Sequence, residues 1–357
     1  MRKLAFGCAL LLSLAVVAGA SFAQALQKVV LLHSQPQITA AFAYSSSLPV
    51  YLGYFKEEGL DVEVNSTKGA AAAMQLVVGG RADAAIGNPS GAMLAIQKGA
   101  DVRFYYTSIR GDIFGIGLPA DSGLKSLEDL RGKTIGVSSF ASGGTNYAKG
   151  LLKTIGLEAG KDYDLVEVGV GARAAGAYKA KQITAFSLWD EAYVSLSQGG
   201  INVTNVLKDP RAKHFAVGSI VVKRSELSER RQILVGLARA IAKAQLFQET
   251  NPEATIRIHW KVYPQTERGG GSDEAVQNEV RVLAVRRPLM SRTAWDTTKF
   301  GDQPQEVIQK FQDYLIATGV LSKAMDVDNY YTNGLIDEIN RFDRAAVVKQ
   351  AKEYKMP

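Results

Sequence analysis

The chain has 357 residues, of which 46% are hydrophobic and 22% are charged, so it can bury large cores, and its length suggests two domains. One cysteine and three histidines exclude a disulfide scaffold and a cysteine-ligated metal site, and argue against an all-histidine metal site. The 42 basic and 35 acidic residues give a formal charge of +7, but the basic residues are scattered, which argues against nucleic-acid binding.

The first 23 residues have the order of a secretory signal peptide. Arg2 and Lys3 precede an apolar stretch that runs from position 4 to about 18, and small residues flank a predicted cut after Ala23. The stretch is shorter than the roughly 20 residues of a membrane-spanning helix, so a cleaved signal is favoured over a membrane anchor. Cleavage would remove the single cysteine, Cys8, and would place the protein in a periplasm, away from nicotinamides and phosphorylated nucleotides.

Short apolar runs alternate with helical segments along the rest of the chain. A first block has predicted strands at 28–33, 61–64, 81–87 and 102–108, and helices at 53–60, 70–78 and 91–98. A second block has predicted strands at 134–137, 164–168 and 184–188, and helices at 126–130, 146–155, before 181 and after 189. One more strand at 216–222 precedes a largely helical remainder. This alternation predicts an α/β fold with mostly parallel sheets, and the two blocks predict two lobes.

Small and hydroxyl residues occupy the corners where these strands lead into helices. In open α/β sheets, ligands bind beyond the carboxyl ends of the strands, where helix N-termini offer N–H groups that suit an anion. Ordinary helix capping explains any one corner equally well, but two lobes would present all of them to one cleft. The candidate ligand-binding residues are Ser34, Gln35, Ser46, Thr67, Lys68, Asn88, Ser90, Arg110, Ser138, Ser139, Ser142, Gly143, Thr145, Gly171, Trp189 and Asp190.

Other motifs do not favour catalysis or a cofactor. Gly169-x-Gly171-x-x-Ala174, with Asp190 about 20 residues further on, has the pattern of a dinucleotide fingerprint, but the export signal argues against that cofactor. His33, His214 and His259 are far apart in the sequence, and we assign them structural or surface roles. We therefore expect no metal, no cofactor and no catalytic residue.

Four segments carry a family resemblance. They are Gly53-Tyr54-Phe55-Lys56-Glu57-Glu58-Gly59-Leu60-Asp61-Val62, the Gly-Gly-Arg-Ala-Asp-Ala-Ala stretch at 79–85, the Leu-Glu-Asp-Leu-Arg-Gly-Lys-Thr-Ile-Gly-Val stretch at 127–137, and Ala-Phe-Ser-Leu-Trp-Asp at 185–190. In this order they are similar to recurring pieces of the periplasmic solute-binding proteins that serve sulfonates, taurine, nitrate and thiamine-pyrimidine precursors. The similarity runs from about residue 28 to residue 225.

The resemblance implies a two-lobed periplasmic binding protein fold of type II, with mixed, mostly parallel sheets and two crossovers between the lobes. Lobe one would comprise 28–117 and 214–357, and lobe two would comprise 118–213. It also implies the periplasmic substrate-binding component of an ABC importer, which we expect to be a monomer that delivers a small-molecule ligand to an inner-membrane ABC permease.

The residues at the strand-to-helix corners also indicate the charge of the ligand. Only Asp190 places a carboxylate at an expected cleft corner, so a small anionic organic solute of the sulfonate, nitrate or carboxylate type is favoured over a cation. A pyrimidine-precursor binding protein, a related enzyme and a ligand-presenting sensor subunit are the alternatives.

Overall fold

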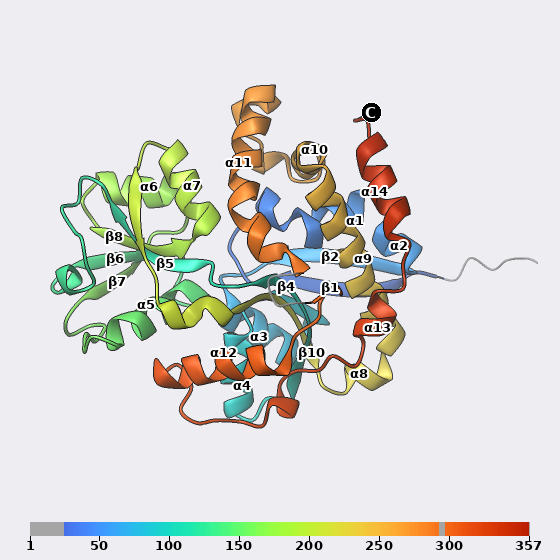
Figure 1. The fold of residues 1–357 in the computed structure, drawn as a ribbon, viewed down its shortest axis with the longest axis horizontal. Helices are drawn as coiled ribbons and strands as arrows, with labels where there is room; N and C mark the ends of the chain where they lie inside the picture. The colour runs from blue at the N-terminus through green and yellow to red at the C-terminus, as the bar shows by residue number, and fades with distance from the viewer. Residues whose placement is uncertain (1–24, 293–296, 357) are drawn as a thin grey trace, which may run out of the picture.

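Two five-stranded sheets organise the chain (Figure 1). The structure is a computed structural model that describes residues 25–292 and 297–356, without the side chains at 213 and 214. The predicted signal peptide over residues 1–23 lies outside the described residues, and so does the side chain of His214. No helix within the described residues is long and apolar enough to cross a membrane.

The first sheet is mixed. Its strands are β1 (Gln27–His33), β2 (Leu60–Ser66), β3 (Ala84–Gly87), β4 (Val102–Arg110) and β10 (Ala216–Lys223), in the order β2-β1-β3-β10-β4. β1 pairs in parallel with β2 and β3, whereas β10 runs antiparallel to β3 and β4. Val29, Leu31 and Leu32 of β1 are all buried, as expected for a central strand covered on both faces.

The second sheet repeats this arrangement. Its strands are β5 (Phe114–Pro119), β6 (Thr134–Val137), β7 (Asp164–Glu167), β8 (Ala185–Trp189) and β9 (Val203–Leu207), in the order β7-β6-β8-β5-β9. β6 is parallel to β7 and β8, and β5 is antiparallel to β8 and β9. The α/β fold with mixed sheets is therefore confirmed.

Helices connect and cover the strands. The helices around the first sheet are α1 (Ser47–Tyr51), α2 (Tyr54–Glu57), α3 (Ala70–Val78), α4 (Ser90–Gln97), α8 (Glu226–Glu229), α9 (Arg231–Thr250), α10 (Pro252–Val262), α11 (Asp273–Met290), α12 (Gln305–Ala317), α13 (Ile336–Ile339) and α14 (Arg344–Glu353). Those around the second sheet are α5 (Gly143–Lys153), α6 (Ala172–Lys179) and α7 (Asp190–Gln198). Of these, α5, α10, α11 and α14 begin at a polar side chain that caps the first turn. Ser142 and Ser272, for example, accept hydrogen bonds from Thr145 N and Ala275 N at the first turns of two helices.

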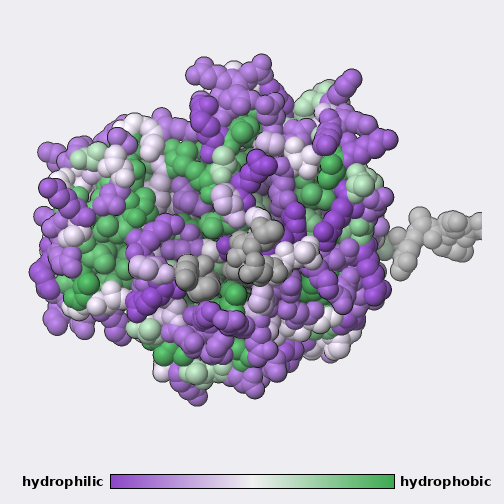
Figure 2. Space-filling view, in the orientation of Figure 1, coloured by the Kyte–Doolittle hydropathy of each residue, from purple (hydrophilic) through white to green (hydrophobic). Residues whose placement is uncertain are grey.

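The chain passes between the sheets twice, after β4 and after β9. Phe114 to Gly117 of β5 pair with β8, so the predicted limit of the first lobe after residue 117 falls inside a strand of the second sheet. We therefore move that limit to the segment between Arg110 and Phe114, and we call the parts built on the first and second sheets the first and second lobes. Figure 1 shows the second lobe on the left, with α11 of the first lobe beside α7. The outer face in Figure 2 is mainly hydrophilic, with hydrophobic residues showing over the second lobe.

Tyr147 joins the two crossover segments. Its hydroxyl donates to Asp112 Oδ2 at 3.0 Å in the first crossover and accepts from Asp209 N at 2.8 Å in the second. The Asp112 carboxyl also accepts from Phe114 N at 2.8 Å, and burial raises its pKa to about 7. One phenol thus fixes the distance between the two segments about which the lobes would move.

We expect Tyr147→Phe to lower the free energy of unfolding by about 1–3 kcal/mol, because it leaves two buried polar groups without their partner. Denaturant unfolding measures the change. Tyr178→Phe is the control, since it removes an exposed hydrogen bond to Asp121, and it should stay within about 0.5 kcal/mol of the parent. Equal effects of the two substitutions would contradict the role given to Tyr147.

Candidate functional site

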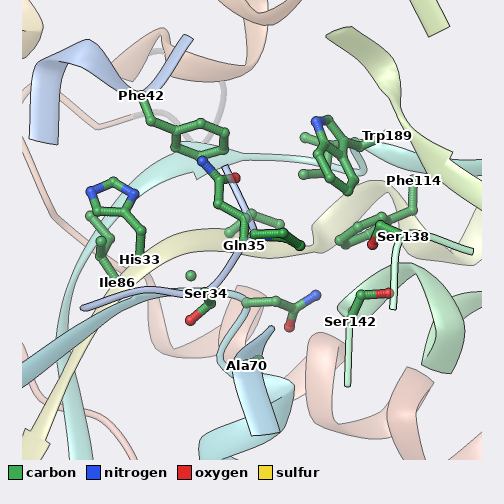
Figure 3. Close-up of a pocket in the computed structure, with 16 residues that line it drawn as sticks. His33, Ser34, Gln35, Phe42, Ala70, Ile86, Phe114, Ser138, Ser142 and Trp189 are labelled. Carbon is green, nitrogen blue, oxygen red and sulfur yellow. The ribbon is translucent and has the colours of Figure 1, made fainter. Parts of the chain in front are cut away.

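A small cavity lies between the two sheets, where strands of both lobes end (Figure 3). Its volume is about 50 Å³, which holds a few water molecules but no organic solute. The cleft must therefore widen before a ligand of that kind can enter. The lining residues are His33, Ser34, Gln35, Pro36, Phe42, Ala70, Ile86, Gly87, Asn88, Ile113, Phe114, Ser138, Ser142, Gly143, Trp189 and Val217.

Many of the lining residues directly follow a strand or begin a helix. Ser34 and Gln35 follow β1, Asn88 follows β3, and Ser138 follows β6. The parallel pairing of β1 with β3 brings the first two corners together, since parallel strands end at the same edge of a sheet. Of the predicted ligand-binding residues, the cavity lining contains Ser34, Gln35, Asn88, Ser138, Ser142, Gly143 and Trp189.

Three helices begin at this cavity. Ala70 and Gly143 are the first residues of α3 and α5, and Asn88 Oδ1 accepts from Ser90 N at 2.8 Å at the start of α4. Each helix start carries a partial positive charge from its unpaired N–H groups. The cavity can therefore receive a negatively charged or strongly polar group although its lining contains no lysine or arginine.

Gln35 contributes a free donor to the lining. Its side chain is about nine-tenths buried, and its Nε2 has no hydrogen-bond partner among the described residues. In Figure 3 the Gln35 side chain lies among the residues that surround the cavity, near Phe42. A buried amide donor without a partner is destabilising, so it marks a position where a ligand acceptor would be stabilised.

Aromatic rings form much of the remaining wall. Phe42 comes from the first lobe, and Phe114 and Trp189 come from the second. Trp189 Nε1 donates to Glu191 Oε1 at 3.0 Å, which fixes the orientation of the indole ring. The sequence analysis missed Phe42 and Phe114, because an aromatic residue in a buried segment gives no local sign of which side it faces.

His33 also lines the cavity. Burial lowers its pKa to about 4, so the imidazole is neutral near pH 7. Its Nε2 lies 3.2 Å from the carbonyl oxygen of Ser45, which suits an Nε2–H donor. This histidine therefore acts as a neutral, fixed wall residue.

Four of the predicted hydroxyl residues support the cavity loops and do not line the cavity. The Thr67 hydroxyl donates to His33 O at 2.9 Å, the Ser46 hydroxyl donates to Phe42 O at 2.8 Å, and the Thr145 hydroxyl donates to Ser139 O at 2.7 Å. Ser90 is buried in the first turn of α4. The hydroxyl groups of the first three residues and the backbone N–H of Ser90 form local hydrogen bonds that hold the strand-to-helix corners in place.

Ser139 and Lys68 form a contact between the lobes. The Ser139 hydroxyl donates to the carbonyl oxygen of Lys68, whose side chain is exposed. At the neighbouring Gly69, which has a φ of 150°, an added Cβ would lie 2.4 Å from Ala141 O. Only glycine permits this close approach of the two backbones, so the lobes are in direct contact along this side of the cavity.

Arg110 and Gly171 lie away from the cavity. The Arg110 side chain is buried and donates to Lys299 O at 3.3 Å. It is therefore directed toward the C-terminal part of the first lobe. Gly171 precedes α6 and lines two further hollows between the lobes. Arg110, which the sequence predicts to reach a ligand, therefore does not line the cavity in this arrangement.

Asp190 belongs to a buried ion cluster between the lobes. Arg286 of α11 donates through Nε to Asp190 Oδ2 at 3.0 Å, and its Nη2 lies 3.0 Å from Glu191 Oε2 on α7. Burial opposes the charge of Arg286, but the two carboxylates raise its pKa. Burial raises the pKa of Glu191 to about 7, with Asp190 acting in the same direction and Arg286 opposing it. The sequence analysis missed Arg286, which is 96 residues away from Asp190.

We expect Arg286→Met to open the cleft, because two carboxylates cannot stay buried together without their cation. Small-angle X-ray scattering of the unliganded protein should show a larger radius of gyration. Arg287→Met is the matched control, since its side chain is exposed on the same helix. An unchanged radius of gyration and unchanged stability in Arg286→Met would contradict the role of the cluster.

Glu191→Gln tests the titration of the cluster, whose other charged members are Asp190, Arg286 and, more weakly, Glu279. The folded state holds a proton on Glu191 that the unfolded state releases, so the free energy of unfolding falls as the pH rises from 4.5 to about 7. Glu191→Gln should make this slope shallower in denaturant titrations, and Asp112 should account for part of the remainder. An identical slope in the variant would contradict the raised pKa.

Among the described residues, no group of three or more His, Cys, Asp and Glu side chains is arranged to hold a metal ion. The cavity therefore offers helix starts, hydroxyl and amide groups, and aromatic rings. Together with two sheets joined by two crossovers, this defines a protein of the periplasmic binding protein fold.

Comparisons with known proteins agree with this class. Residues 48–255 match the family described as NMT1/THI5 like, and the chain belongs to this family. It is 22% identical over 315 residues to the riboflavin-binding protein RibY of Chloroflexus aurantiacus, covering 84% of this chain and 86% of that protein. The resemblance to solute-binding proteins noted in the sequence is thus confirmed.

Solved structures show the same fold. The alkanesulfonate-binding protein SsuA of Xanthomonas axonopodis pv. citri, bound to MOPS, has a TM-score of 0.63 and 18% identity over 85% of this chain and 98% of its own. The periplasmic nitrate-binding protein NrtA of Synechocystis PCC 6803 has a TM-score of 0.60 and 15% identity, covering 93% of this chain and 99% of its own. The desulfurization enzyme DSZB has a TM-score of 0.55 and 16% identity, covering 87% of this chain and 98% of its own.

Proposed function

We propose that this chain is the periplasmic substrate-binding component of an ABC importer and that it closes its two lobes on a small organic solute. The observation that carries the proposal is the cavity between the two sheets, lined from both lobes by strand ends and helix starts. A ligand that contacts both lobes binds the closed form better and shifts the population toward it. The sulfonate-binding, nitrate-binding and riboflavin-binding proteins to which the chain is similar support this function.

The cavity lining suggests the chemistry of the ligand. A small sulfonate, nitrate or carboxylate would be held by the starts of α3, α4 and α5 and by the hydroxyl groups of Ser138 and Ser142. The rings of Phe42, Phe114 and Trp189 favour a second class, which is a planar heteroaromatic solute with one polar or anionic edge. We favour this second class, because the lining contains no cationic side chain and because RibY is named for a planar ligand.

We propose binding without covalent chemistry. His33, the titratable group of the lining, is neutral near pH 7 and has its Nε2 next to the Ser45 carbonyl oxygen, so it is a poor candidate for a general acid. The desulfurization enzyme of the same fold makes turnover a necessary control. Any bound compound should therefore be recovered unchanged after incubation with the protein.

Location and partners form part of the proposal. We propose export by the segment 1–23, action as a monomer in the periplasm and docking on an inner-membrane ABC permease. The mass of the secreted protein tests the cut after Ala23, and genes for a permease and an ATPase next to this one would favour uptake over sensing.

The function itself is tested with natively purified protein. Mass spectrometry of the compounds that copurify identifies the solute, and calorimetry of the stripped protein against sulfonates, nitrate, aromatic acids, pyrimidines and flavins measures its affinity. Saturable binding of one class at about one site per chain is the expected result. A protein that carries no solute and binds none of these compounds would overturn the proposal.

Gln35→Leu separates a binding role from a structural role. We expect the affinity for the copurified solute to fall about tenfold, because the ligand loses one buried hydrogen bond. The free energy of unfolding of the unliganded protein should stay the same or rise, because the substitution removes an unpartnered buried amide. Gln75→Leu, at an exposed position on α3, is the control. A loss of stability together with unchanged affinity would assign Gln35 a structural role only.

A further inference from the structure

The ion cluster between the lobes has two acidic side chains for one basic side chain. Arg286 lies on α11 of the first lobe, whereas Asp190 and Glu191 begin α7 of the second lobe, and the two helices are in contact. The side chain of Arg286 is 1% exposed and that of Glu191 is 3% exposed, so both are shielded from water. If both carboxyl groups were ionised, the cluster would contain a buried negative charge without a matching cation, which is unfavourable.

The geometry of the cluster shows which carboxyl group is less well compensated. Asp190 accepts a hydrogen bond from Arg286 Nε at 3.0 Å and also pairs with Nη2. Glu191 Oε2 lies 3.0 Å from the same Nη2 but accepts no hydrogen bond among the described residues. Its other oxygen, Oε1, accepts from the uncharged indole of Trp189. Glu191 is therefore the carboxyl group that a proton would stabilise most.

The other titratable groups near Glu191 do not supply the missing positive charge. Glu279 on α11 adds negative charge, and its own partner is Arg268, with Nη1 and Oε1 3.4 Å apart. Tyr44 lies in the short helix Ala40–Ser45, and burial raises its pKa to about 12, so it is neutral near pH 7. These surroundings agree with the raised pKa of Glu191, about 7, of which burial is the main cause.

We infer that closing of the cleft takes up a proton at Glu191, so that a lower pH favours the closed form and tightens the binding of a solute between the lobes. The inference uses the lobe closure of the proposed function and adds a proton to it. When the lobes separate, α11 moves away from α7 and water reaches Glu191. The carboxyl group then ionises at its ordinary pKa, because burial no longer opposes the charge.

The pH range of the effect follows from the two states of Glu191. Its pKa is about 7 in the closed form, against an ordinary value of 4.5 when it is exposed. The ratio of closed to open protein is therefore highest below pH 4.5 and falls, by up to about tenfold per pH unit, until about pH 7. Above that pH both forms have released the proton, and the ratio stays constant.

Small-angle X-ray scattering of the unliganded mature protein and calorimetry with the copurified solute test the inference. We expect the radius of gyration to rise, or the affinity for the solute to fall, between about pH 5 and about pH 7, with no further change up to about pH 8. Calorimetry at about pH 6, in buffers of different ionisation heat, should show that binding takes up about one proton per chain.

Glu191→Gln identifies the group that takes up the proton. The substitution keeps the size of the side chain and an acceptor for Trp189 Nε1, but the amide cannot be protonated in this pH range. The variant should lose most of the pH dependence and keep the values that the parent shows at about pH 5. Glu158→Gln, at an exposed position of the second lobe, is the matched control and should keep the pH dependence of the parent.

Asp190→Asn provides a second variant if Glu191→Gln fails to fold. It leaves one carboxyl group for one guanidinium, so Glu191 stays ionised in the closed form and the pH dependence should again be lost.

The outcomes separate this inference from the proposed function. If neither measurement depends on pH in the parent, or if Glu191→Gln keeps the same dependence, the inference is overturned and the proposed function stands. If the protein binds no solute, the proposed function is overturned, and the scattering of the unliganded protein by itself tests the inference.

Discussion

Parallel strand pairing within each sheet is the constraint on which the rest of this structure depends. β1 is parallel to β3 in one lobe, and β6 is parallel to β8 in the other, so their carboxyl ends meet in pairs. The chain crosses between the sheets after β4 and after β9, and residues at both pairs of ends line one cavity. The residues that follow these strands then become the lining of one cavity, whatever their distance in the sequence.

The two lobes touch through contacts of two physical kinds. At Gly69 and Ala141 the contact is steric and requires the absence of a side chain. At Arg286, Asp190 and Glu191 it is electrostatic, because the buried guanidinium of the first lobe has its carboxylate partners on the second lobe. The same cluster holds the Trp189 indole through Glu191, so the contact between the lobes and the shape of the cavity are physically linked.

A fold shared by binding proteins and an enzyme does not decide between these functions. That decision depends on the side chains in the cleft. Here the lining consists of helix starts, hydroxyl groups, amides and rings, with one neutral histidine. Such groups can orient a guest molecule and exclude water, which supports the proposed binding role.

The sequence by itself determined the alternation of strands and helices, the family, and those cavity-lining residues that directly follow a strand, such as Ser34, Asn88 and Ser138. These features are local, since periodicity and capping depend on neighbouring residues and parallel strands converge at one edge. Only the tertiary structure decided that Arg110 turns away from the cavity, that Phe42 and Phe114 face it, and that Arg286 meets Asp190. Those outcomes depend on which distant segments pack together, and no local pattern in the chain encodes that pairing.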